Sequence, residues 1–149
     1  MKVSFKGDYA LKIIMDLSMN WNQGITPIRE ISKRQDIPER FLEQIITTLK
    51  RGNYVKTVRG QKGGVYLGKP PSKITMGEII RLIEGPTSPI TCVSRSGYAH
   101  CNFEGRCALR GVFAEVRDHI NEVVDAVTFQ DLVEKTKKLE TRDVLDYCI

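Results

Sequence analysis

Apolar residues recur at the three- and four-residue spacing of an amphipathic helix through the first fifty positions of the chain. They predict a helix over residues 8–20 and two short helices over residues 26–35 and 38–52. Thr26 is expected to cap the first short helix, and Gly52 to close the second in a left-handed conformation. Two short helices separated by three or four residues, the second amphipathic, are typical of a helix-turn-helix.

The pattern changes to strands directly after the second short helix. Residues 54–58 alternate and are rich in β-branched side chains, residues 59–64 form a basic, glycine-rich turn, and residues 65–67 return as a second strand. A helix-turn-helix followed by a basic hairpin is typical of a winged helix. Arg59 and Lys62 would place positive charge at the tip of the wing, where it can meet phosphate or a narrow minor groove.

The second half of the chain is helical around one long irregular stretch. A helix is predicted over residues 75–84, an irregular loop over residues 87–106, and a last helix from Thr128 to about Lys138. Between the loop and that last helix, apolar residues step by three or four positions in a narrow seam, which comprises Leu109, Val112, Val116, Ile120, Val123 and Val127. The seam predicts a long dimerisation helix; the alternative is a long helix that packs on its own domain.

These elements predict a mostly α fold with a small β-wing, in which a winged helix-turn-helix is joined to a long dimerisation helix. The expected organisation is a DNA-binding domain over residues 1–85, a cysteine-bearing loop over residues 86–108, and the dimerisation and C-terminal helices over residues 107–149. No apolar run is long enough for a membrane span, and no secretory signal is recognisable, so the expected location is the cytoplasm.

Charge is distributed unevenly between the two halves. Residues 1–73 hold 14 Lys and Arg against 6 Asp and Glu, whereas the remainder holds 9 against 12. A basic first half joined to a mildly acidic second half favours contact between the first half and a polyanion, although an uneven solvated surface gives the same numbers.

Three of the four cysteines, Cys92, Cys101 and Cys107, fall on the irregular loop and its junction with the long helix. Such clustering indicates metal, iron–sulfur or redox chemistry more than packing. From spacing alone, an iron–sulfur cluster, a three-thiolate zinc site, a thiol redox switch and inert cysteines all remain open. No base and orienting group accompany the cysteines in the sequence, so an enzyme with a cysteine nucleophile is not expected.

Three segments, residues 4–11, 41–45 and 58–68, together resemble one family of winged-helix bacterial transcription regulators, which includes IscR, NsrR and CymR. The resemblance runs from the first residues to about Phe129. It implies a homodimer that presents two recognition helices to successive major grooves of double-stranded operator DNA. The residues at the family's DNA-contacting positions are Ser4, Lys6, Arg40, Glu43, Gln44, Arg59, Gly60 and Lys62.

The residue types at those positions suit base readout. Arg40 can pair with guanine and Gln44 with adenine, and Glu43 can accept a hydrogen bond from cytosine. A solvated or capping carboxylate is the alternative for Glu43. Ser4 and Lys6 precede the predicted first helix and are expected to hold the DNA backbone.

The resemblance also implies that the three loop cysteines bind an iron–sulfur cluster. A four-iron four-sulfur cluster is favoured over a two-iron two-sulfur cluster, because Arg110 occupies the position at which a relative carries a histidine ligand, and arginine cannot bind metal. Asp8 matches an acidic residue that completes the cluster across the dimer in a nitric-oxide-sensing relative. His100 is a second candidate for the fourth ligand, and Cys148 is expected to be an incidental thiol.

The function expected from this resemblance is that of a DNA-binding regulator, most simply a repressor, whose operator affinity depends on an iron–sulfur cluster that senses redox, nitric oxide or iron status. The alternative is a metal-free regulator controlled by a partner protein or by thiol oxidation, as in the cysteine-metabolism repressor of the family. Metal content separates the two.

Overall fold

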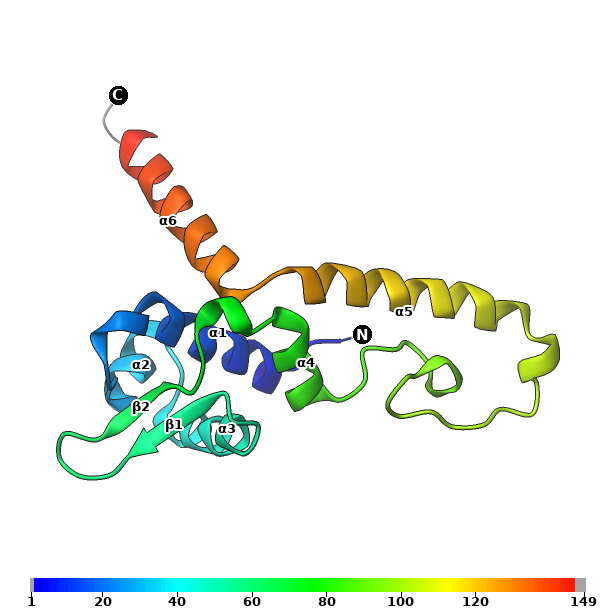
Figure 1. Ribbon diagram of the computed structural model, residues 1–149, viewed down its shortest axis with the longest axis horizontal. Coiled ribbons are helices and arrows are strands. Elements are labelled where there is room, and N and C mark those ends of the chain that lie inside the picture. Colours follow the sequence, from blue (N-terminus) through cyan, green and yellow to red (C-terminus); the bar gives the residue numbers. More distant parts are fainter. Residues whose placement is uncertain (1, 147–149) are drawn as a thin grey trace.

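The computed structural model describes residues 2–146, with side chains to residue 142, and it has the predicted mostly helical fold with a two-stranded wing (Figure 1). Its regular elements are α1 (Phe5–Met19), α2 (Ile28–Gln35), α3 (Glu39–Arg51), β1 (Val55–Val58), β2 (Gly64–Leu67), α4 (Met76–Glu84), α5 (Ala108–Ala126) and α6 (Phe129–Asp146). Four short 3₁₀ turns join them: η1 (Trp21–Gln23), η2 (Pro71–Lys73), η3 (Thr91–Val93) and η4 (Glu104–Arg106).

One hydrophobic core joins the DNA-binding elements to the start of α6. Helix α1 packs against α2, α3, α4 and α6, and its buried side chains include Ile13 and Ile14. Leu42 and Leu49 fill the core from α3, and Phe129 enters it from the first turn of α6 with no exposed surface. Burial of these large apolar side chains supplies the main stabilisation of the winged-helix body. It also fixes the beginning of α6 against α1.

The helix ends correct three details of the sequence prediction. Helix α1 begins at Phe5 instead of residue 8, because the Ser4 side chain accepts a hydrogen bond from the Gly7 amide and caps it. Thr26 is not a cap: its backbone pairs with Val65 of the wing, with N···O distances of 2.8 Å in both directions, and the following proline is the N-cap of α2. Gly52 has an ordinary φ of −79°, whereas Asn53 takes the left-handed conformation at φ 60°. Asparagine tolerates that conformation better than most residues. Gly52 instead gives space to its neighbours, because a Cβ atom there would come within 2.8 Å of the Tyr54 ring and 2.9 Å of Leu82.

Helices α5 and α6 extend away from the winged-helix body in different directions (Figure 1). Helix α5 contacts the body through α4, and it contacts the preceding loop through η3. Helix α6 begins as predicted, because Asp131 accepts hydrogen bonds from the backbone and hydroxyl of Thr128 at 2.8 and 2.6 Å. It continues to Asp146, beyond the predicted end near Lys138. Among residues 2–146, no helix combines the length and apolar character needed to cross a membrane.

Candidate DNA-binding surface and cysteine loop

The polar face of α3 is open to solvent. Leu42, Ile45, Ile46 and Leu49 occupy its buried face. The opposite face exposes Arg40, Glu43, Gln44 and Thr47. The predicted base-reading residues therefore lie together on one exposed helix face. Thr47 extends this face by one further turn; sequence reasoning missed it, although its spacing from Arg40 and Gln44 was a usable signal.

The beginning of α1 lies beside α3. A cavity of about 490 Å³ is lined by Phe5, Lys6 and Tyr9 from α1 and by Phe41, Gln44 and Ile45 from α3. Lys6 is exposed, which places a positive charge next to the predicted base-reading face.

Ser4, the third predicted residue of this region, has a structural role that the sequence did not reveal. Its hydroxyl and amide donate to one carboxylate oxygen of Glu84, at 2.6 and 2.9 Å, and so tie the beginning of α1 to the end of α4. A contact between Ser4 and DNA stays a prediction.

The wing presents its basic turn to solvent. Arg59, Gly60 and Lys62 are exposed. Gly60 has φ 111°, a conformation that side-chain-bearing residues rarely adopt, so the turn requires glycine at this position. Glycine is needed at position 64 for a different reason, because a Cβ atom there would come within 2.2 Å of the Thr26 carbonyl oxygen. The glycines thus allow a tight turn and a close strand pairing, while the two cations stay free to meet a phosphate backbone.

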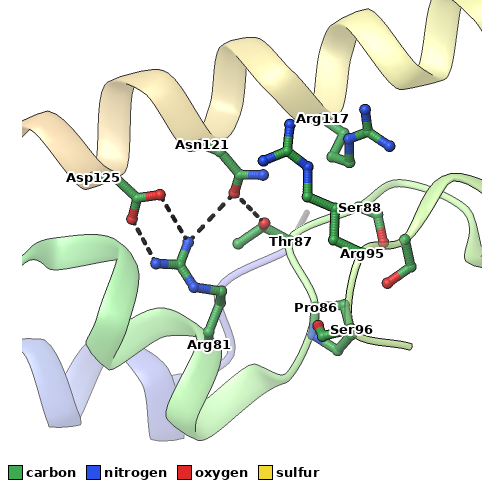
Figure 2. A pocket seen from close by; sticks show the side chains of 10 residues that line it. Arg81, Pro86, Thr87, Ser88, Arg95, Ser96, Arg117, Asn121 and Asp125 are labelled. Carbon is green, nitrogen blue, oxygen red and sulfur yellow. Dashed lines mark hydrogen bonds and ion pairs between the residues drawn. The ribbon is translucent and has the colours of Figure 1, made fainter. Parts of the chain in front are cut away.

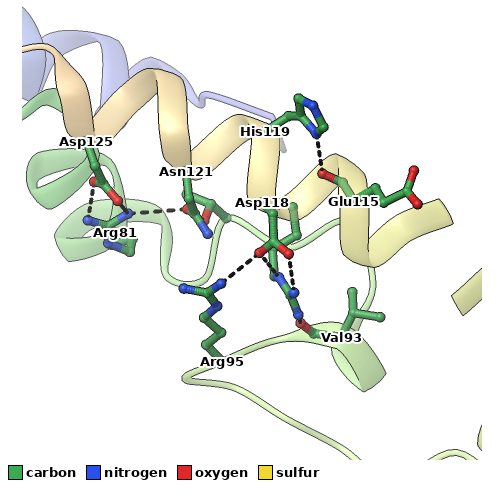
Figure 3. Close-up of polar contacts among 10 residues, drawn as sticks. Arg81, Val93, Arg95, Glu115, Asp118, His119, Asn121 and Asp125 are labelled. Atoms are coloured by element: carbon green, nitrogen blue, oxygen red, sulfur yellow. Dashed lines mark hydrogen bonds and ion pairs between the residues drawn. The ribbon is translucent and has the colours of Figure 1, made fainter. Parts of the chain in front are cut away.

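The cysteine loop is fastened to α5 by a small charged network (Figure 3). The Arg117 guanidinium donates to the carbonyl of Val93, and it donates to both oxygens of Asp118 at 2.9 and 2.8 Å. Arg95, on the loop, donates to the same carboxylate at 2.8 Å. These hydrogen bonds, first from Arg117 and then from Arg95, hold the pKa of Asp118 below its ordinary value, so Asp118 is ionised at neutral pH.

A second network joins α4 to α5 and to the start of the loop. Arg81 of α4 donates to both carboxylate oxygens of Asp125, at 2.6 and 3.3 Å, and more weakly to Asn121 at 3.4 Å. Thr87, which is almost fully buried, donates to Asn121 at 2.5 Å (Figure 2). The face of α5 that carries these residues is therefore occupied by α4 and by the loop.

The three predicted cysteine ligands are free thiols and are half-buried. Cys92 lies in η3, Cys101 precedes η4, and Cys107 is the N-cap residue of α5, with no hydrogen bond from its side chain to the helix. Within residues 2–146, no three His, Cys, Asp or Glu side chains come close enough together to hold a metal ion. The structure therefore offers thiols of the required chemistry on one loop, but it does not bring them into a ligand set.

The two candidates for a fourth ligand have separate surroundings. Asp8 lies in the first turn of α1, where its half-exposed carboxylate contacts Lys12 at 2.8 Å. His100 is exposed on the loop, 3.9 Å from Glu104. Neither joins the cysteines within one described chain. His119 is exposed on α5, and Cys148 lies outside the described residues.

A family model of iron-dependent transcriptional regulators, Rrf2, matches residues 3–135, which include the helix-turn-helix, the wing, the cysteine loop and α5. The chain belongs to the Rrf2 family. It is 35% identical over 136 residues to the transcriptional regulator CymR of Bacillus subtilis, covering 91% of this chain and 92% of that protein. The family description and the name of this relative are those of transcriptional regulators, not of enzymes.

Solved structures of Rrf2-type regulators have the same fold. The structure of B. subtilis CymR, described as its global cysteine regulator, has a TM-score of 0.78 and covers 91% of this chain and 98% of its own. IscR of T. potens is 30% identical, with a TM-score of 0.74 and coverage of 93% and 90%. An oxidized form of Staphylococcus aureus CymR is also 30% identical, with a TM-score of 0.72 and coverage of 90% and 97%. The winged-helix prediction is thus confirmed, and the chain resembles both CymR and IscR regulators.

Proposed function

We propose that this Rrf2 regulator binds operator DNA as a homodimer and that its operator affinity is controlled by an iron–sulfur cluster on Cys92, Cys101 and Cys107. The observation that carries the proposal is the presence of three free, half-buried thiols on a loop that is fastened to α5. A change in that loop would reach the proposed dimer helix directly.

The exposed seam of α5 supports the homodimer. Leu109, Val112, Val116 and Val123 are between 41% and 65% exposed, and they follow one side of the helix. The residues of α5 that bind α4 and the loop, such as Arg117 and Asp125, lie on the other side. A narrow apolar seam with no cover in a single chain is well matched by the same seam of a second copy, because a two-fold interface is self-complementary.

The arrangement of α3 and the wing supports contact with DNA. In the proposed complex, the polar face of α3 enters the major groove, where Arg40 and Gln44 read base edges and Glu43 accepts from cytosine. Lys6, Arg59 and Lys62 hold the phosphate backbone on either side of the groove. Gly60 allows close approach at the tip of the wing, and Ser4 contacts the backbone at the start of α1.

The cluster proposal rests on the chemistry of the donors, since the thiols do not converge in a single chain. Iron–sulfur clusters require thiolate ligands, and a flexible loop can wrap three of them around one cluster. A cluster bound here would supply sensitivity to redox state, nitric oxide or iron supply. Asp8 is proposed as a fourth ligand from the second chain, because its carboxylate is 47% exposed and, among the described residues, is paired with the surface residue Lys12 alone. A four-iron cluster is favoured over a two-iron cluster.

The first experiment is an absorption spectrum with iron, sulfide and zinc analysis on protein purified without oxygen. Visible absorption with equal amounts of iron and sulfide is the expected result, and the amount per chain gives the cluster type. Replacement of any one of the three loop cysteines by Ala should remove the iron, whereas Asp8→Ala should weaken iron retention and leave the oligomeric state unchanged. Protein that holds zinc or no metal after reconstitution would rule out the cluster and leave DNA binding in place.

The second candidate is a metal-free regulator controlled by thiol oxidation or by a partner protein. It is favoured by the separation of the three thiols in the described part of the chain and by the likeness to CymR, one of whose solved structures is described as oxidized. Operator binding would then change on treatment with a mild thiol oxidant in metal-free protein. If oxidation of metal-free protein left operator binding unchanged, control by thiol oxidation would be ruled out. Control by a partner protein would then remain.

A further inference from the structure

A polar cavity of about 220 Å³ lies where α4, the cysteine loop and α5 meet (Figure 2). Its lining includes three arginines, one from each of these elements: Arg81 from α4, Arg95 from the loop and Arg117 from α5. The loop adds four hydroxyl side chains between Thr87 and Ser96. Three positively charged residues from three separate elements thus surround one small space.

The positive charge at this cavity is only partly balanced. Arg81 is matched by Asp125, which accepts two hydrogen bonds from it. Arg95 and Arg117, in contrast, share the single carboxylate of Asp118. One guanidinium charge is therefore in excess at the loop end of the cavity. The Arg95 side chain is 70% exposed and uses one of its nitrogens in this network, so its other donors can reach a ligand.

The chemistry of the lining selects a class of ligand. A guanidinium group presents paired donors that match a carboxylate or phosphate, and hydroxyl groups hydrogen-bond the polar body of a small molecule. The cavity holds roughly the volume of seven water molecules, and it is smaller than pockets that take drug-sized ligands. A small metabolite fits these limits.

We propose that this cavity binds a small organic anion carrying a phosphate or carboxylate group, with Arg95 as the main contact and with Arg81 and Arg117 as the surrounding positive charge. The inference goes beyond the proposed function, which requires no small molecule. A bound anion would compete with Asp118 for Arg95 and would join α4, the loop and α5 through one ligand. It would therefore shift the loop beside Cys92, and by linkage any effect of the anion on DNA binding must be matched by an effect of DNA on anion binding.

The test is isothermal titration calorimetry on the full chain with inorganic phosphate, O-phosphoserine and citrate, with sodium chloride at matched ionic strength as the blank. Saturable binding of at least one of the three is expected. Arg95→Ala should weaken it by about tenfold or more, because a hydrogen-bonded charge is lost. Arg95→Lys keeps the charge without the paired donors, and it should give an intermediate affinity. The identity of the tightest probe separates a phosphate ligand from a carboxylate ligand.

Arg106→Ala is the matched control, because Arg106 is an exposed arginine of the same loop that does not line the cavity. It should leave the affinity unchanged. The proposal is overturned if none of the three probes binds saturably, or if Arg106→Ala weakens binding as much as Arg95→Ala, since the effect would then reflect net charge alone. The measurement involves neither DNA nor iron, so its failure is separate from any failure of the proposed cluster control.

Discussion

Arg117, in the middle of α5, donates a hydrogen bond to the main-chain carbonyl of Val93, the residue that follows Cys92. The same guanidinium holds Asp118, which in turn holds Arg95 on the other side of Val93. The segment around Cys92 is thus positioned by the helix that carries the proposed dimer seam. Arg117 therefore links a movement of the loop to a movement of α5, together with the contact between Arg95 and Asp118.

Arg117→Ala removes that link and is expected to loosen the loop without unfolding the body. The hydrogen bonds of Arg117 go to Val93 on the loop and to its neighbour Asp118, not to α1, α3 or the wing, so these elements should keep their packing. Faster amide exchange in residues 91–95 and a lower yield of reconstituted iron are the expected results, measured by hydrogen–deuterium exchange and iron analysis. Arg106→Ala serves as the control. Exchange in residues 91–95 that matches the control would show that Arg117 does not position the loop.

Arg34→Ala tests the connection between α1 and α2. Asp16 is 3% exposed, and its two oxygens accept from Arg34 at 2.9 and 2.8 Å and from Gln35 at 3.0 Å. The substitution leaves this carboxylate buried with one neutral partner. The expected loss in free energy of unfolding is about 2 kcal/mol, reduced from that of a fully buried pair because the Arg34 side chain is 40% exposed. Urea denaturation measures it, and an equal loss in Lys33→Ala would refute a specific role for the pair.

Asp131 predicts a pH dependence of stability. Hydrogen bonds from the hydroxyl and the backbone of Thr128 lower the pKa of Asp131 below its ordinary value of 3.8. Because the native pKa is the lower one, its contribution to stability is present above the unfolded pKa and is lost as the pH falls through the native pKa. Asp131→Asn should therefore destabilise the protein at pH 7. Its free energy of unfolding should then fall less than that of the wild type when the pH is lowered below about 5.

Urea denaturation of the wild type and of Asp131→Asn at several pH values checks this expectation. Glu140→Gln, an exposed position on the same helix, is the control and should keep the pH dependence of the wild type. A parallel pH profile for Asp131→Asn and the wild type would mean that the cap does not contribute through its charge.

The DNA-binding half could be predicted from the sequence because its signals are local. Helical spacing in α3 and the glycine-rich turn after β1 each depend on a few neighbouring residues. One error arose where a distant residue decides: Thr26 pairs with Val65 of the wing, which removes it from its expected capping role. Nothing in the sequence near Lys138 stops α6, since neither glycine nor proline follows.

The loop shows the same limit more strongly. Cysteine spacing revealed three thiols on one segment, but spacing does not say whether their sulfur atoms converge. The arginine-lined cavity was missed altogether, because Arg81, Arg95 and Arg117 are 14 and 22 positions apart and meet only through the packing of α5 on α4. A charged residue at an unremarkable position carries no signal of its partners until the tertiary structure is known.

Arg40→Ala and Lys62→Ala should affect operator binding in different ways. Arg40 lies on the base-reading face of α3, so its loss should cost about 1–3 kcal/mol on the operator and relax the preference at one base pair. Lys62 lies in the wing turn, so its loss should weaken binding to all sequences. The slope of the logarithm of the binding constant against the logarithm of salt concentration should fall by about one, the value for one phosphate contact. Fluorescence anisotropy on matched and altered operators at several salt concentrations separates the two. If Arg40→Ala weakened binding equally on matched and altered operators, Arg40 would contact a phosphate and not a base.

Val116→Asp tests the proposed dimer seam. Val116 lies at the centre of α5 and is 41% exposed in the single chain, so an aspartate there is tolerated by the monomer. In a two-fold interface the same substitution would face its own copy and bury two like charges without partners, which strongly opposes association. The expected result is a folded monomer by analytical ultracentrifugation and circular dichroism.

The operator affinity of Val116→Asp should fall steeply as well, because two half-sites would no longer be bound by one linked pair of recognition helices. Gly111→Asp is the matched control: it adds the same charge to α5 five residues earlier, turned well away from the seam, where nothing lies within 4 Å of a new Cβ atom. It should remain dimeric and bind DNA normally. If Val116→Asp sedimented like Gly111→Asp, the dimer would have to form through a different surface, and α5 would be a helix that serves only to hold the cysteine loop.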